Sequence, residues 1–286
     1  MVLCLYKNDS KVEDTFQNLE RGKKGKKNLF LNNLTNTILI EMEFKLEICV
    51  ENMASALAAK EGGADRIELC QALQVGGLTP SAGLIKWVKK YLDIPVYMLI
   101  RPRAGDFVYS PEEILVMEED IHAGISLGID GFVTGALRYD GRIDKEVCSK
   151  LIRAANGLPV TFHRAFDVTP DYQSLQDVID LGFKRILTSG HCKTAHEGKL
   201  NIKKLIDEAN SRIIIMPGSG VSPMNLKDII DTTGAVEFHS SCQSKTAVSL
   251  NEKSVVQGTT FYPVTSVDVV KEMKDILRVV QVINVL

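Results

Sequence analysis

A glycine that follows an amphipathic segment and precedes a short apolar run recurs four times in this chain and constrains its fold strongly. The four copies are residues 63–69, 128–133, 182–187 and 234–238. Glycine adopts the left-handed conformation that ends many helices without a steric penalty. Each copy therefore predicts the end of a helix, a tight turn and the start of a strand.

Four more strands complete a regular alternation of strands and helices. Strands are predicted after Pro95 and Pro159, where proline occupies a first position that needs no ladder donor, and at residues 44–50 and 212–216. Helical patterns lie between the strands or follow the last one, at residues 111–127, 145–155, 172–181 and 267–283. Alternating strands and helices predict a parallel sheet, and eight such units favour a single-domain (β/α)₈ TIM-like barrel. A doubly wound dinucleotide fold is disfavoured, because residues 50–54 contain no glycine-rich turn.

The first 41 residues differ from the rest, which divides the chain into an arm, 1–41, and a barrel domain, 42–286. Residues 21–27 hold five basic side chains among seven positions, without a sustained hydrophobic period. We expect a disordered arm there. A nuclear address, a contact with a polyanion, a solvated tail and an upstream extension all fit this composition.

Composition limits the classes of function. The formal net charge is −2, and no segment approaches the length of a membrane span, so we expect neither nucleic acid at the barrel nor a membrane partner. Six scattered cysteines without an export signal predict free thiols in a reducing compartment. The expectation is a cytoplasmic protein, with the nucleus also open to it, that forms a homo-oligomer.

Polar side chains end several of the predicted strands, where barrel enzymes carry their active sites. Side-chain alternation places these residues on the inner face in pairs: Glu47 and Cys49, Glu68 and Cys70, Thr161 and His163, Glu237 and His239. Buried ionisable groups are costly unless they are paired or functional. One interpretation is a structural network in which Glu47, Glu68 and Glu237 pair with Arg101, Arg103 and Arg164.

The other interpretation is acid–base chemistry on a small anion. Here Glu68 or Glu237 is the general base, His163 or His239 is the general acid, and Arg101, Arg103 and Arg164 hold the anion. The glycine-rich turn at 217–222 precedes a helical pattern and resembles a phosphate cup, so Gly218, Gly220, Ser240 and Ser189 are candidate anion-binding residues. Gly-rich turns also occur only to reverse the chain.

Cys49 and Cys70 end neighbouring strands, whose axes lie about 4.8 Å apart. Two adjacent thiols suit Cu(I), which prefers sulfur and accepts few ligands, whereas structural zinc takes four. Two reduced cysteines packed as small apolar side chains explain the same pattern. His191, Cys192 and His196 share one loop, but their spacing matches no metal motif and is typical of an exposed polar loop.

These residues together resemble the CutC family of copper homeostasis proteins over residues 44–243. The resemblance rests on LEICV at 46–50, GADRIELC at 63–70, GGLTPS at 76–81, IRPR at 100–103, DF at 106–107, VTFHRAFD at 160–167, LTSG at 187–190 and EFHS at 237–240. It implies a TIM-like barrel that handles copper in the cytoplasm, with Cys49 and Cys70 as Cu(I) ligands. Ala104 departs from the glycine that is common in the family at that position.

Two functions follow from the sequence. The first is a copper homeostasis protein that binds or traffics Cu(I) through thiols at the carboxyl face of the barrel. The second is a TIM-barrel enzyme, of isomerase, lyase or hydrolase type, that acts on a small anionic or phosphorylated metabolite.

Overall fold

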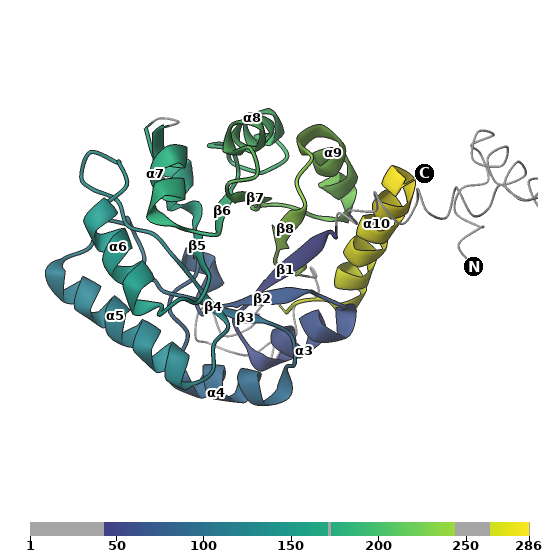
Figure 1. Cartoon of the computed structure of the whole chain (residues 1–286). Coiled ribbons are helices and arrows are strands. Elements are labelled where there is room, and N and C mark those ends of the chain that lie inside the picture. The colour runs from purple at the N-terminus through teal and green to yellow at the C-terminus, as the bar shows by residue number, and fades with distance from the viewer. Residues whose placement is uncertain (1–42, 171–172, 244–263, 286) are drawn as a thin grey trace, which may run out of the picture. The chain divides into compact units, whose positions relative to one another are not determined.

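Eight parallel strands form the centre of the protein, as the sequence predicts (Figure 1). The computed structural model describes residues 43–170, 173–243 and 264–285. The strands are β1 (Lys45–Val50), β2 (Arg66–Leu69), β3 (Val96–Leu99), β4 (Gly131–Thr134), β5 (Val160–Phe162), β6 (Arg185–Thr188), β7 (Ile214–Pro217) and β8 (Glu237–Ser240).

Helices follow the strands and surround them, in chain order around the sheet (Figure 1). They are α3 (Met53–Gly62), α4 (Ala82–Tyr91), α5 (Pro111–Ser126), α6 (Lys145–Ala154), α7 (Gln173–Leu181), α8 (Lys199–Ala209), α9 (Pro223–Thr233) and α10 (Val267–Val285), with short 3₁₀ turns η2 (Leu73–Val75) and η3 (Arg164–Val168). The four predicted helices are confirmed to within two residues at each end. None of the helices in the described ranges is long and apolar enough to cross a membrane.

The sheet is a nearly closed barrel. Its hydrogen-bonded order runs β7-β6-β5-β4-β3-β2-β1-β8, so each strand pairs with its sequence neighbour and β1 also pairs with β8. The predicted (β/α)₈ architecture is therefore confirmed. The predicted arm over residues 1–41 lies outside the described residues, and the predicted homo-oligomer stays a prediction.

Side-chain alternation separates an outer core from the interior of the barrel. Leu46, Ile48 and Phe238 belong to the main hydrophobic core that fills the space between the strands and the helices. Tyr97, Leu99 and Val133 belong with Cys70 to a second, smaller cluster of buried residues. The expected outward position of the apolar strand residues is confirmed, and the polar residues between them point into the barrel.

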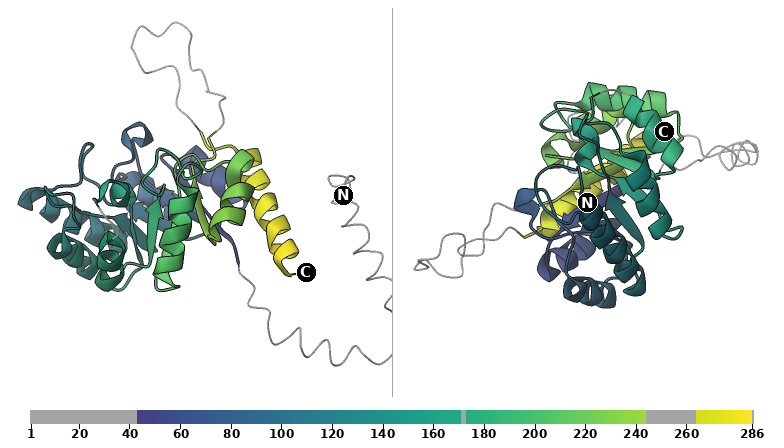
Figure 2. Two further views of the ribbon diagram at one scale, coloured as in Figure 1. Left: turned by 90° about the horizontal axis from the view of Figure 1, so that it is seen from above. Right: turned by 90° about the vertical axis from the view of Figure 1, so that its left-hand side faces the viewer.

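Helix α10 packs against α3 and α9, and Figure 2 shows the yellow α10 beside the purple α3. Gly62, the last residue of α3, allows this close approach. A Cβ atom at position 62 would lie 2.4 Å from the Cβ atom of Val270.

We predict that Gly62→Ala lowers the free energy of unfolding by about 1–3 kcal/mol, because the added methyl group overpacks the contact between α3 and α10. Urea denaturation measures the effect. The matched control is Gly83→Ala in α4, where the nearest atom to an added Cβ is 3.9 Å away. Alanine there should gain up to about 1 kcal/mol from helix propensity. Equal stability of the two variants would contradict the packing argument.

Candidate functional site

A cluster of buried polar side chains lies at the carboxyl ends of β1, β2 and β8. The sheet register aligns Cys49 with Glu68 and Glu47 with His239. The Sγ atom of Cys49, a carboxylate oxygen of Glu68 and a ring nitrogen of His239 all lie within 4.8 Å of one another. The structure thus brings together three residues that the sequence singled out in separate roles. We call them the Cys49–Glu68–His239 cluster.

Glu47 orients the imidazole of this cluster. One carboxylate oxygen of Glu47 lies 2.7 Å from Nδ1 of His239, and the other accepts a hydrogen bond from Nε of Arg66. Nε2 of His239 lies 3.8 Å from Oε2 of Glu68. Because Nδ1 is occupied by Glu47, Nε2 is the nitrogen that faces the cluster. A carboxylate that fixes the ring in this way is typical of histidines at metal sites.

Burial and neighbouring charges shift the ionisation of this group in opposite directions. Burial raises the pKa of Glu68 to about 7, although the charge of His239 opposes the rise. Burial alone would lower the pKa of His239, but Cys49, Glu68 and Glu47 outweigh it and raise that pKa well above 6.5. Burial would also raise the pKa of Glu47, but Arg66 and His239 hold it below 4.5. Burial thus favours the protonated form of Glu68, and the surrounding acidic groups favour the protonated form of His239.

Glu237 lies in an ion-pair network formed with two arginines that the sequence analysis did not single out. Its carboxylate accepts hydrogen bonds from Nη2 of Arg66 at 2.7 Å and from Nε of Arg185 at 3.0 Å. Both guanidinium groups pack on the ring of Tyr97, at 4.8 and 5.2 Å from its centroid. We call Glu47, Arg66, Arg185 and Glu237 the buried ion network.

The predicted pairing of Glu47, Glu68 and Glu237 with Arg101, Arg103 and Arg164 is wrong. The buried partners come from the first residues of β2 and β6, because side chains at the strand starts reach the barrel axis, whereas arginines beyond the strand ends reach the surrounding loops. With both oxygens of Glu237 bound to arginine, this residue is better suited to a structural role than to that of a general base.

The repeat itself contains a signal for these arginines. The third residue after each repeat glycine is the first residue of an even-numbered strand, and these residues are Arg66, Gly131, Arg185 and Glu237. Alternate strands of a TIM barrel contribute side chains to one interior layer. Arg66 and Arg185 share the same spacing as Glu237 and are therefore expected to meet it.

Cys70 lies one residue beyond β2, at the next inward position after Glu68, and is completely buried in the inner apolar cluster. Its thiol lies 3.5 Å from the carbonyl oxygen of Val50 and can donate to it. Burial raises the pKa of Cys70 far above 9, and the negative charge of Glu68 adds to the rise. Of the two predicted thiols, Cys49 is the one that lies with an imidazole and a carboxyl group.

Of the residues predicted to bind an anion, the structure brings Arg164 and Ser189 together, with Nη2 of Arg164 donating to Ser189 Oγ at 3.0 Å, but internal carboxylates engage the predicted donors. Arg103 binds Glu113, with 2.5 Å between Nε and Oε1, and Arg164 binds Asp167 at 2.8 Å. The carboxylate of Asp167 also accepts hydrogen bonds from the backbone N–H groups of Ser189, at 3.0 Å, and His191, at 3.3 Å. An internal carboxylate thus occupies the donors around Ser189.

The predicted phosphate cup is also engaged in internal contacts. The N–H group of Gly218 donates to Thr188 O at 2.9 Å, the carbonyl oxygen of Gly220 accepts from Asn225, and Ser240 Oγ donates to Val221 O at 2.8 Å. A Cβ atom at Gly218 would lie 2.3 Å from Cδ1 of Leu187. The close packing of Leu187 is therefore enough to explain a glycine at position 218. Anion binding there stays a prediction.

His163 and Arg101 lie at the ends of β5 and β3, apart from the Cys49–Glu68–His239 cluster. Both are buried, and the ring of Phe107 packs on the two of them, at 4.8 Å from the His163 ring centroid and 4.9 Å from Cζ of Arg101. Burial and the charge of Arg101 lower the pKa of His163 to about 3. At neutral pH this histidine is neutral, which suits a hydrogen-bond donor better than a general acid.

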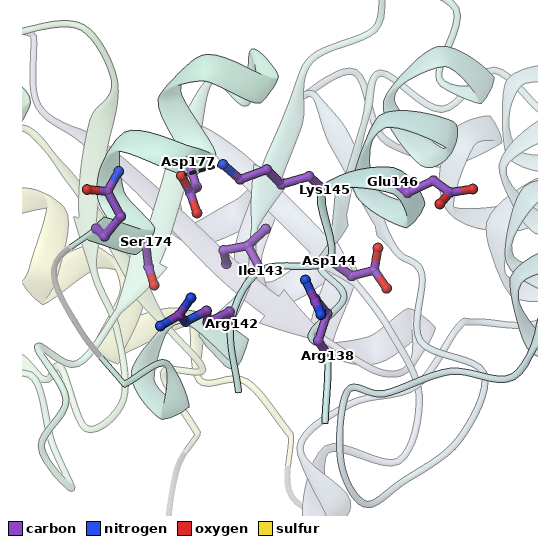
Figure 3. Close-up of a pocket in the computed structure, with 9 residues that line it drawn as sticks. Arg138, Arg142, Ile143, Asp144, Lys145, Glu146, Ser174 and Asp177 are labelled. Carbon is purple, nitrogen blue, oxygen red and sulfur yellow. Dashed lines mark ion pairs between the residues drawn. The ribbon is translucent and has the colours of Figure 1, made fainter. Parts of the chain in front are cut away.

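Two other features contribute no residue to the cluster. A cleft between the loop after β4 and the start of α7 is lined by charged side chains, and Lys145 and Asp177 form an ion pair across it at 2.8 Å (Figure 3). In the loop after β6, Nε2 of His196 lies 2.8 Å from a carboxylate oxygen of Asp228. Within the described ranges, His191, Cys192 and His196 belong to no group of three convergent metal ligands.

The raised pKa of Glu68 predicts a pH dependence of stability. Because its folded-state pKa, about 7, exceeds the ordinary value of 4.5, the folded state holds a proton that the unfolded state has released. Stability is therefore lost as pH rises from 4.5 to about 7. Glu68→Gln should remove this loss and gain about 1–3 kcal/mol over the wild type at the alkaline end.

Urea unfolding of both proteins across this pH range measures the difference. Glu272→Gln, at an exposed position of α10, is the control and should follow the wild-type curve. A constant difference between Glu68→Gln and the wild type at all pH values would contradict the assignment.

Comparison with known proteins agrees with the fold. The sequence profile of the CutC family matches residues 44–244. A human copper homeostasis protein cutC homolog is 48% identical over 218 residues, which cover 75% of this chain and 80% of the relative. A CutC protein from Xylella fastidiosa is 50% identical over 203 residues, which cover 71% of this chain and 76% of the relative.

Comparison with solved structures also supports the barrel fold. The crystal structure of a copper homeostasis protein CutC from Streptococcus agalactiae superposes with a TM-score of 0.67 at 40% identity, covering 69% of this chain and 98% of that one. Phosphoribosylanthranilate isomerase from Thermotoga maritima, at 15% identity, has a TM-score of 0.51 over 82% of this chain and 98% of that one and shares the fold alone. The barrel topology, the matched segments and these relatives together show that this chain belongs to the CutC family.

Proposed function

We propose that this protein binds Cu(I) as cargo at the carboxyl face of the barrel, with Cys49 as the principal ligand and His239 as the second. The observation that supports it is the approach of Cys49 Sγ and a ring nitrogen of His239 within a buried group that spans at most 4.8 Å. The relatives named copper homeostasis proteins support the choice of copper.

The donor set fits a soft cation. Cu(I) favours thiolate sulfur, accepts imidazole nitrogen and tolerates low coordination numbers. Nε2 of His239 faces the cluster while Glu47 holds Nδ1, so the ring is already oriented toward a ligand beside Cys49. Glu68 offers a harder oxygen, which favours divalent ions over Cu(I) and makes it a neighbour of the bound ion rather than a main ligand.

Proton release accompanies binding in this proposal. The thiol of Cys49 and the imidazole of His239 must both lose their protons before they coordinate a metal. The raised pKa of His239 makes this loss costly at acid pH, so affinity for Cu(I) should increase as the pH rises. Glu68 lies 3.8 Å from Nε2 of His239 and can accept the proton that leaves the ring.

Cys70 is the third residue of the proposed copper site and has a lesser role than Cys49 and His239. Its thiol is fully buried, faces the carbonyl of Val50 and resists deprotonation because of its raised pKa. Cys70 can bind the copper ion only after it loses this proton.

We propose that copper binding takes place in the cytoplasm, because the five cysteines in the described part of the chain are all unpaired.

We predict that Cys49→Ser lowers the affinity for Cu(I) by at least about a hundredfold, because it removes the only sulfur ligand of the Cys49–Glu68–His239 cluster. His239→Gln should cost about tenfold or more, in line with the loss of a ligand nitrogen, and Cys70→Ser less than Cys49→Ser. Anaerobic titration of the reduced full-length protein against a chromogenic Cu(I) chelator measures the affinities.

Cys192→Ser is the matched control, because Cys192 is a partly exposed thiol in the loop after β6, outside the cluster. It should bind Cu(I) as the wild type does. Unchanged affinity in Cys49→Ser would refute the proposed site, and a larger loss in Cys70→Ser than in Cys49→Ser would transfer the main role to Cys70.

A second candidate function is acid–base catalysis on a small anionic metabolite by the same cluster. The observation that favours it is the approach of a Glu68 carboxylate oxygen to within 3.8 Å of Nε2 of His239. Burial raises the pKa of Glu68 to about 7, and a general base works best with a pKa near the operating pH. Isomerase, lyase and hydrolase chemistry all fit such a pair.

Metal-free protein distinguishes this candidate from copper binding. If the chain is an enzyme, turnover of a screened set of carboxylated and phosphorylated metabolites should fall at least about a hundredfold in Glu68→Gln. It should persist in the copper-depleted wild type. Turnover that Glu68→Gln leaves unchanged would contradict a catalytic Glu68.

A further inference from the structure

Three buried polar atoms in the described part of the chain have no hydrogen-bond partner, and they belong to neighbouring residues. They are Nε of Arg101, the hydroxyl of Tyr109 and Nε2 of His163. Phe107 packs on both Arg101 and His163, and the charge of Arg101 also acts on Tyr109, so the three residues are neighbours. Buried polar groups are almost always satisfied, so a cluster of exceptions points to a missing partner.

Arg101 carries a buried charge without a counter-ion. It is 5% exposed, and no carboxylate in the described ranges forms an ion pair with it. Its terminal nitrogens donate to the carbonyl oxygens of Val75, Gly77 and Gly105, at 2.9, 3.1 and 2.7 Å. These carbonyls fix the guanidinium but leave its charge uncompensated. An isolated buried charge is costly unless an anion compensates it.

His163 contributes a neutral donor next to this charge. Its Nδ1 accepts a hydrogen bond from the backbone N–H of Ala165 at 3.3 Å, which places the proton of the neutral ring on Nε2. The low pKa of the ring, about 3, keeps it neutral at physiological pH. Nε2–H is therefore a donor without an acceptor in the 5% exposed side chain of His163.

The strand positions place these donors on the same side of the barrel interior. Leu99 and Arg101 alternate onto one face at the end of β3, and Thr161 and His163 do so at the end of β5. Gly135, which follows the intervening strand β4, has no side chain to separate them, and a Cβ there would lie 2.9 Å from Nδ1 of His163. Phe107 packs on both residues, and Leu99 and Val133 belong to the inner apolar cluster.

We propose that Arg101 and His163 form a binding site for a small carboxylate ligand. Nε–H of Arg101 and Nε2–H of His163 supply two donors, and Arg101 supplies one positive charge, which matches the single negative charge of a carboxylate. Inorganic phosphate would bring more negative charge than the site compensates. The aromatic and aliphatic neighbours suit an apolar body on the carboxylate. The site shares no residue with the Cys49–Glu68–His239 cluster and does not depend on copper.

Acetate is the probe for the test, with inorganic phosphate and chloride at matched ionic strength as comparisons. Titration of the full-length protein with acetate should shift the ¹⁵N resonance of His163 Nε2 saturably and raise the melting temperature above that in chloride. His163→Phe keeps the aromatic packing but removes the donor, and it should weaken acetate binding by roughly 10–100-fold, as the loss of a hydrogen bond to a charged group requires.

Two controls separate this site from the rest of the molecule. Arg103→Met removes a nearby arginine that is paired with Glu113, and Cys49→Ser disables the proposed copper site. Both should bind acetate as the wild type does. If His163→Phe does not fold, His163→Gln, whose amide offers an N–H donor, should retain acetate binding, and the wild-type NMR titration needs no variant.

Three results would overturn the proposal. They are the absence of a saturable acetate effect on His163 Nε2, a preference for phosphate over acetate, and acetate binding that His163→Phe leaves unchanged.

Discussion

The buried ion network of Glu47, Arg66, Arg185 and Glu237 is the interaction on which the rest of the barrel interior depends. Four ionised side chains, each at most 7% exposed, fill the start of the barrel and satisfy one another. Such a network is stable only while every member is present, because removal of one partner leaves an uncompensated buried charge. It also requires space, which Gly131 provides by leaving room for the ring of Tyr97 between β3 and β4.

The network connects the structural part of the barrel to its chemistry through Glu47. One oxygen of this carboxylate binds Arg66, and the other binds His239. Arg66 therefore holds Glu47, and Glu47 fixes the orientation of the His239 imidazole beside Cys49. Another part of the carboxyl face differs, because Arg101 and His163 lie beside Phe107 and form no ion pair with a carboxylate among the described residues. One barrel mouth thus combines a thiol–imidazole group with a donor pair.

Much of the fold could be predicted, because the signals are local. A glycine at the end of a helix and alternation along a strand both act within a few residues, so the strands, the helices and the inward position of Cys49, Glu68 and His239 followed from the sequence. The partners of the carboxylates did not. Arg66 and Arg185 stand at the strand starts, whereas the predicted site residues follow from polar side chains at the strand ends. Asp167 occupies backbone donors near Ser189, where the sequence favours an external anion.

The sequence by itself determined that eight strands alternate with helices, that polar residues line the inside of the barrel and that the chain resembles the CutC family. Only the tertiary structure decided which of these residues meet. The strand register sets Cys49 beside Glu68 and Glu47 beside His239, while Cys70 continues into an apolar layer. Which residues meet across a parallel sheet depends on how whole βα units stack and stagger, and the alternation within a single strand does not encode that arrangement.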